Sequence, residues 1–159
     1  MKLTTIEKYL KLIIIGFAIC GLLVYAMILP NVGQSLAGNY PEFAHWYYPW
    51  LIFLWITVIP CYLVLISAWK VAENIGADRS FSYENGKCFK QIALYAGGDS
   101  IFFLLGNIGL WLAGYNHPGI MVVSMILVFF GFAITLASKS LAQLVDNAAE
   151  LQEESEWTI

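Results

Sequence analysis

Residues 92–113 read IALYAGGDSIFFLLGNIGLWLA, and this stretch decides the fold. At about 1.5 Å of rise per residue, it is long enough to cross the roughly 30 Å hydrocarbon core of a bilayer as one helix. It nevertheless contains Asp99, nine residues beyond the basic boundary residue Lys90. A carboxylate at that depth costs about 2.5–3.5 kcal/mol on insertion scales unless it faces protein or water. We therefore expect other membrane helices to shelter Asp99.

The whole chain has the composition of a membrane protein. Of its 159 residues, 60% are hydrophobic and 12% are charged, and the mean hydropathy is +0.71. These values lie far from those of an ordinary soluble domain. A helix-length hydropathy window predicts four membrane segments, at about 12–29, 50–69, 92–113 and 120–137. The predicted fold class is all-α: a polytopic membrane protein whose four-helix transmembrane bundle forms a single domain over residues 1–159.

The positions of the basic residues predict the orientation in the membrane. The eight are Lys2, Lys8 and Lys11 before the first segment, Lys70, Arg79, Lys87 and Lys90 between the second and third, and Lys139 after the fourth. The two remaining loops contain none. Because loops rich in Lys and Arg stay in the cytoplasm, both termini are predicted to be cytoplasmic.

Proline, glycine and serine residues predict where the helices end or bend. Pro30 is expected to end the first helix, since proline cannot donate a backbone hydrogen bond. Pro60 predicts a kink, which is either packing geometry or the mark of a hinge or cavity. Gly76 is expected to stop the second helix with a positive φ, and Ser82 to cap the next. The short turn at 114–119 makes the last two segments antiparallel neighbours.

The fourth helix is predicted to continue into the cytoplasm as an acidic tail over residues 138–159. Apolar residues recur there at helical spacing: Leu141, Leu144, Val145, Ala148 and Leu151. No basic residue follows Lys139. The tail's acids are the candidate partner-binding residues: Asp146, Glu150, Glu153, Glu154 and Glu156.

The first external loop, residues 31–49, ends in the aromatic run FAHWYYPW at 43–50. Such a density of Trp and Tyr is typical of the lipid headgroup belt. The run is interpreted as an interfacial anchor, or alternatively as an aromatic cleft that binds an external ligand.

Polar residues inside the segments form a candidate intramembrane cluster. Cys20, Cys61 and Asp99 each lie nine residues from a basic boundary residue and hence at a similar depth. If their faces converge, they could form a soft-metal or redox-sensing site, since thiolates favour zinc or copper(I). Alternatively, the cysteines are small core residues, and a protonated Asp99 donates to a backbone carbonyl or to Thr135. Asn107 completes the candidate cluster and is also suited to fixing the packing of neighbouring helices.

Metal and catalytic chemistry find little support in the sequence. His45 and His117 are both predicted to be external, with Glu42 near the first, but nothing in their spacing requires them to meet. No catalytic triad, phosphate-binding loop or nucleic-acid-binding patch is present. We expect no enzyme activity, no cofactor, no metal and no direct contact with nucleic acid. Gly16, Cys20, Gly106 and Gly109 would permit close helix packing within the chain or in a homo-oligomer.

Two stretches resemble a known family. They are IGADRSFSYEN at 75–85 and the terminal AELQEESEWTI at 149–159. Together with the four segments, they resemble the YoaS-like family of small bacterial four-helix membrane proteins of unknown function. The family ending EENDLTI reads EESEWTI at 153–159 here, so the residues before Thr158 are altered.

The resemblance implies a location and a partner. A bacterial protein of this kind lies in the inner membrane, and members of the family are often encoded beside a small Cro/C1-type helix-turn-helix regulator. The expected function is that of a membrane-bound sensor or anchor that controls this cytoplasmic DNA-binding partner. The alternative is a small transport, channel or immunity-type protein with a ligand or ion path near Asp99 and Pro60.

Overall fold

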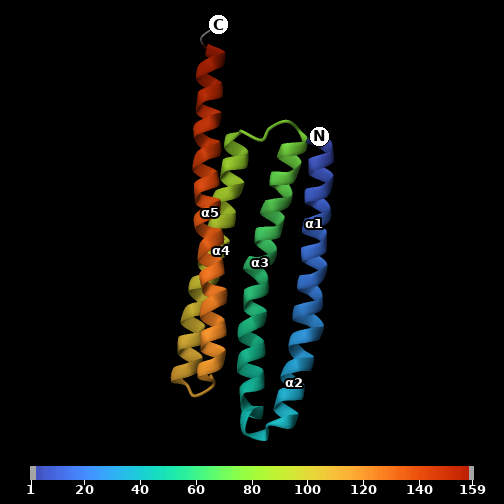
Figure 1. The fold of residues 1–159 in the computed structure, drawn as a ribbon, viewed down its shortest axis with the longest axis vertical. Helices are drawn as coiled ribbons and strands as arrows, with labels where there is room; N and C mark the ends of the chain where they lie inside the picture. Colours follow the sequence, from blue (N-terminus) through green and yellow to red (C-terminus); the bar gives the residue numbers. More distant parts are fainter. Residues whose placement is uncertain (1–2, 158–159) are drawn as a thin grey trace.

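The computed structural model describes residues 3–157, and every regular element among them is helical (Figure 1). The elements are α1 (Leu3–Leu23), the π-helix η1 (Val24–Ile28), α2 (Leu29–Asn39), the 3-10 helix η2 (Pro41–Trp46), α3 (Tyr47–Gly76), α4 (Tyr83–Leu112) and α5 (Pro118–Trp157). Lys2, Thr158 and the side chain of Glu156 lie outside the described part. Four continuous helical stretches are long and apolar enough to cross a membrane, which confirms the predicted all-α class.

The first membrane helix does not end at Pro30, contrary to the prediction. It continues from α1 through η1 into α2 and stops at Asn39. In η1 the N–H of Leu29 bonds to the carbonyl of Val24, which shifts the hydrogen-bond register directly before Pro30. The missing N–H of Pro30 therefore falls in the first turn of α2, where proline is tolerated.

The four long helices form an open row rather than a closed ring. α3 packs against both α1 and α4, and α4 packs against α5. Within the described residues, α1 makes no backbone approach to α4 or α5. Consecutive long helices are antiparallel, so the N-terminus, the α3–α4 loop and the C-terminal end of α5 lie at one end of the molecule (Figure 1). We call this the terminal end, and the opposite one the hairpin end.

Small residues bring the α4 and α5 backbones close together. A side chain at Gly131 would overlap Ser100, and a Cβ at Gly97 would lie 3.1 Å from the Thr135 side chain. Both polar partners are satisfied within their own helices: the hydroxyl of Ser100 donates to the Ala96 carbonyl over 2.7 Å, and that of Thr135 to the Gly131 carbonyl over 2.8 Å. Thr135 thus bonds to Gly131 and not to Asp99, so the predicted alternative of an Asp99–Thr135 bond is not seen.

The α3–α4 loop confirms one predicted signal and corrects another. Ser82 caps α4, and its hydroxyl accepts a bond from the N–H of Asn85 over 3.3 Å. The positive φ falls at Asp78 (59°) and not at Gly76, which is the last residue of α3. A side chain at Gly76 would overlap Glu7 of α1, so close approach of another helix is what this glycine permits.

The last helix extends far beyond the predicted fourth segment. α5 projects past α3 and α4 at the terminal end (Figure 1). Much of this extension is packed, because Ala142, Val145 and Ala149 are buried and Asp146 lies over Gly86 of α4. α4 begins at Tyr83, nine residues before the predicted segment, and so supplies the surface on which the extension rests.

Candidate functional site

A cavity of about 550 Å³ lies halfway along the open side of the row, and all four long helices line it. We call it the Asp99 cavity. Its lining includes Phe17, Gly21 and Tyr25 of the first helix, Thr57, Cys61 and Tyr62 of α3, Tyr95, Asp99 and Phe103 of α4, and Leu127 and Gly131 of α5. Because α1 and α5 do not pack together, these residues line an open groove between the two outer helices.

A chain of polar side chains crosses the floor of the Asp99 cavity. The hydroxyl of Thr57 donates to the carbonyl of Leu54 over 2.7 Å and accepts from the Tyr25 hydroxyl over 3.0 Å. Cys61 Sγ lies 3.9 Å from the Tyr25 hydroxyl and donates to Asp99 Oδ2 over 3.8 Å. Asp99 Oδ1 is buried without a hydrogen-bond partner among the described residues. Among the described residues, the weak hydrogen bond from the Cys61 thiol is thus the one hydrogen bond of the Asp99 carboxyl group.

The structure brings together two of the four predicted cluster residues. Cys61 and Asp99 meet, as the depth argument allowed. Cys20 is exposed and does not line the Asp99 cavity. Its neighbour Gly21 faces Tyr62 of α3, and one residue along a helix rotates the side chain by about 100°. Equal depth did not reveal this rotation.

Asn107, the fourth predicted residue, holds the turn at the hairpin end. Its side chain is buried and donates to the Phe103 carbonyl over 2.8 Å. The amide of Asn116 in the α4–α5 turn donates to both Asn107 Oδ1 and the Asn107 carbonyl, over 3.3 Å each. Asn107 therefore belongs to the packing of the α4–α5 hairpin and not to the polar chain around Asp99.

Tyr25 and Thr57 are the members of the polar chain that sequence reasoning missed. Thr57 lies four residues before Cys61 and so shares its helix face, a signal that was available. Tyr25 lies in the π-helix η1, which alters the rotation of every residue after it. Its position over Thr57 could not be read from an ideal helical repeat.

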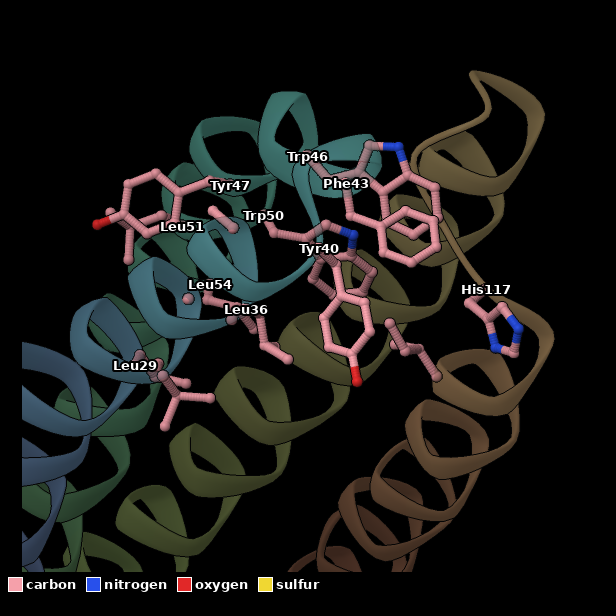
Figure 2. Close-up of a pocket in the computed structure, with 14 residues that line it drawn as sticks. Leu29, Leu36, Tyr40, Phe43, Trp46, Tyr47, Trp50, Leu51, Leu54 and His117 are labelled. Atoms are coloured by element: carbon pink, nitrogen blue, oxygen red, sulfur yellow. The ribbon is translucent and has the colours of Figure 1, made fainter.

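A second cavity, of about 540 Å³, lies at the hairpin end (Figure 2). We call it the aromatic cavity. Its lining includes Tyr40, Phe43, Trp46, Tyr47 and Trp50 from the predicted aromatic loop and start of α3, Leu36 and Ala37 of α2, His117 directly before α5, and Ile120 in the first turn of α5. Figure 2 shows the rings of Tyr40, Phe43 and Trp46 close to one another, with His117 to their right and Tyr47 at the left of the view. The aromatic run thus forms the walls of a cleft.

The two cavities adjoin at Leu29 and Leu54, which line both, and together we call them the groove. The Trp50 indole fixes the hairpin end by donating to the Tyr115 carbonyl over 2.6 Å. The Phe43 and Trp46 rings lie 4.5 Å apart between centroids. Among the described residues, no Lys or Arg lines either cavity.

Among the described residues, His45 and His117 do not belong to a metal-binding group. Across residues 3–157, no three His, Cys, Asp or Glu side chains come together in a metal-binding group. The His45 ring packs edge-on to Tyr115, with centroids 5.5 Å apart. His117 Nδ1 accepts the N–H of Gly119 over 3.1 Å.

At the terminal end, the predicted partner-binding acids differ in their surroundings. Asp146 forms an ion pair with Lys90 across the α4–α5 interface, with Lys90 Nζ and Asp146 Oδ2 2.6 Å apart. It therefore takes part in the packing of α5 on α4, and its predicted partner-binding role stays a prediction. Glu150, Glu153 and Glu154 are exposed. Beside them Leu141, Leu144 and Leu151 are 45%, 64% and 66% exposed, at helical spacing.

These features define a small polytopic α-helical membrane protein with an open lateral groove. The chain belongs to the DUF2975 family of proteins of unknown function, whose family profile matches residues 31–159. The chain is 26% identical to the uncharacterized membrane protein YoaS of Bacillus subtilis over 166 aligned positions, which span 99% of both chains. The YoaS-like resemblance is thereby confirmed.

A shorter similarity links the chain to a much larger protein. Chain 4 of the chloroplastic NAD(P)H-quinone oxidoreductase from Agrostis stolonifera and from Hordeum vulgare is 35% identical over 94 positions. These positions span 53% of this chain and 16% of theirs. No solved structure matches the fold.

Proposed function

We propose that the protein is a membrane anchor that holds a basic DNA-binding protein at the cytoplasmic face of the bacterial inner membrane. One observation carries the proposal: the end of α5 presents exposed leucines beside exposed acids. Leu144 and Leu151 are 64% and 66% exposed although they lie beyond the predicted membrane segment. Glu150 lies on the same stretch and is also exposed. Apolar anchors beside charges are the usual composition of a protein-binding surface.

The proposed orientation rests on the distribution of basic residues. The described basic residues lie toward the terminal end of their helices or in the α3–α4 loop. They are Lys8 and Lys11 near the start of α1, Lys70 near the end of α3, Arg79 in the loop, Lys87 and Lys90 near the start of α4, and Lys139 in the second half of α5. Under the positive-inside rule this end is cytoplasmic. The exposed surface of the α5 extension would then face the compartment that contains DNA.

The chemistry of this surface selects a basic partner. Five acids and no base follow Lys139, so the end of the helix attracts positive charge and repels the anionic inner leaflet. Small DNA-binding proteins carry basic surfaces that bind phosphate. The family resemblance implies such a partner in a neighbouring helix-turn-helix regulator. A regulator held at the membrane would be kept from its operator.

Co-purification from native membranes in mild detergent tests the proposal. Because Ala149 is buried, a chain that ends at Ala149 keeps the packed part of the extension and loses the acidic end. We expect the full chain to recover a helix-turn-helix protein, identified by mass spectrometry, at low salt and to lose it at high salt. The shortened chain should recover none.

Point variants separate surface chemistry from folding. The pair Leu144→Ser and Leu151→Ser removes the exposed leucines and should abolish recovery. Glu42→Lys is the matched control, because it changes an exposed acid of η2 at the hairpin end. Equal recovery by the full chain, the shortened chain and the leucine variant would contradict the proposal.

The groove favours a second candidate function, a ligand or ion path past Asp99. It extends from the aromatic cavity to Asp99, and all four long helices line its deeper part. The two candidates predict opposite results: Asp99→Asn would abolish function in the path hypothesis and would be mild for an anchor. Deletion of residues 150–159 would abolish the function of an anchor and would be mild for a ligand or ion path.

A further inference from the structure

The groove combines apolar walls with a single acidic side chain. Asp99 is the one Asp or Glu that lines either cavity, and among the described residues no Lys or Arg lines them. Within residues 3–157, the Asp99 Oδ1 is buried without a hydrogen-bond partner, and its Oδ2 accepts only from Cys61. An intramembrane carboxylate normally has a partner, so the groove lacks a positive charge at this point.

Aromatic rings line the same cavity as Asp99. Tyr25, Tyr62, Tyr95 and Phe103 line the Asp99 cavity. The ring faces of Tyr and Phe attract cations, and the attraction strengthens where water is excluded. Aromatic rings with one carboxylate are the surroundings that bind an apolar cation.

We propose that the groove binds an apolar organic cation, which enters from the bilayer between α1 and α5 and places its charge beside Asp99. The two cavities, of about 540 and 550 Å³, lie in the range that holds drug-sized ligands. The open side of the helix row gives lateral access. This site is independent of the proposed partner at the end of α5, and it names the ligand class for the second candidate function, the path past Asp99.

Other occupants fit the groove less well. An organic anion would meet Asp99 without a basic residue to pair with. A metal ion would lack ligands, since among the described residues no third His, Cys, Asp or Glu joins Cys61 and Asp99. An uncharged lipid chain would fill the apolar walls but leave the carboxyl group unpaired.

Equilibrium dialysis with radiolabelled tetraphenylphosphonium tests the proposal. The full chain is placed in nanodiscs of phosphatidylcholine, which carries no net charge, and empty nanodiscs give the background. We expect saturable binding that weakens at least about tenfold in Asp99→Asn, because a charge pair in a low-dielectric site is lost. Asp99→Glu keeps the charge and should retain binding.

Matched controls separate the site from general effects. Asp78→Asn makes the same chemical change in the α3–α4 loop, at a φ of 59° that asparagine tolerates, and should leave binding unchanged. Triphenylphosphine oxide, a neutral aromatic probe, should bind no differently to Asp99→Asn and to the unaltered chain. Leu54→Trp, where the cavities meet, should block tetraphenylphosphonium, whereas Leu136→Trp on an exposed face of α5 should not.

The proposal is overturned by any of three results. The first is equal binding of tetraphenylphosphonium by Asp99→Asn and Asp78→Asn. The second is that Asp99→Asn weakens binding of triphenylphosphine oxide as much as binding of tetraphenylphosphonium. The third is that Leu54→Trp leaves tetraphenylphosphonium binding unchanged. The last comparison decides the question if Asp99→Asn does not fold. A failure here leaves the partner surface of α5 untouched, since none of these residues lies in the extension.

Discussion

Lys90 Nζ lies 2.6 Å from Asp146 Oδ2, and the Asp146 side chain rests over Gly86. This ion pair joins the first turns of α4 to the α5 extension. The Lys90 and Asp146 side chains are 62% and 25% exposed, so water screens the pair and its contribution to stability is modest.

We predict that Asp146→Asn loosens the extension without unfolding the membrane helices. The loss should be about 0.2–1 kcal/mol, seen as faster hydrogen exchange at residues 138–157 and little change elsewhere. A double-mutant cycle with Lys90→Met should assign this loss to the pair. The control is Glu84→Gln, which breaks a more exposed pair with Arg79. A uniform rise in exchange along the chain would contradict the local role.

A second prediction concerns the contact between α4 and α5. Gly131→Val forces a side chain into Ser100, and overpacking of this kind costs about 1–3 kcal/mol. The midpoint of thermal unfolding in detergent should fall. Gly98→Ala is a control for an added side chain with free space, because nothing lies within 4 Å of a Cβ at Gly98. It should be neutral or stabilising, since alanine favours a helix over glycine. Equal effects of the two variants would show that α4 and α5 do not pack closely here.

The hairpin end gives a third prediction, at Asn107. Replacing it with Leu removes the acceptor of Asn116 and should cost about 1–3 kcal/mol. The turn at 114–117 should then be cut faster by a protease added to the hairpin side. Asn39→Leu removes only an exposed 3.4 Å bond to Ser35 and serves as the control. An unchanged cleavage rate in the Asn107 variant would mean that this residue does not hold the turn.

The proposed orientation can be tested by labelling single cysteines in intact cells. Cys20, Cys61 and Cys88 are first replaced by alanine or serine. A membrane-impermeant maleimide should then label Glu42→Cys at the hairpin end and leave Asp78→Cys in the α3–α4 loop unlabelled until the cells are opened. The reverse pattern would place both termini outside and would remove the basis for a cytoplasmic partner.

The sequence predicted the features that depend on composition and local chemistry. Apolar length located the four membrane helices, and Ser82 marked the start of α4 because a serine hydroxyl satisfies an early N–H. It did not predict features that depend on rotation. The π-helix before Pro30 carries the first helix on to Asn39 and turns Tyr25 toward Thr57. Cys20 lies at a depth similar to that of Asp99, but its side chain is exposed and does not line the Asp99 cavity.

The acids of the tail show the same distinction. Helical spacing correctly predicted that α5 would continue past the membrane segment. It could not separate Asp146, which pairs with Lys90, from the exposed Glu150. That separation depends on α4 beginning at Tyr83, before its apolar run, and so offering a surface to the extension.

In the proposed function, the end of α5 keeps a DNA-binding partner from its operator. The most direct test of this function is fluorescence anisotropy of a labelled operator fragment, titrated with the purified partner in the presence of nanodiscs that contain this protein. We expect nanodiscs with the full chain to weaken operator binding, whereas nanodiscs with the Leu144→Ser and Leu151→Ser variant, and empty nanodiscs, should leave it unchanged. Identical operator titrations with all three kinds of nanodisc would show that the end of α5 does not hold the partner.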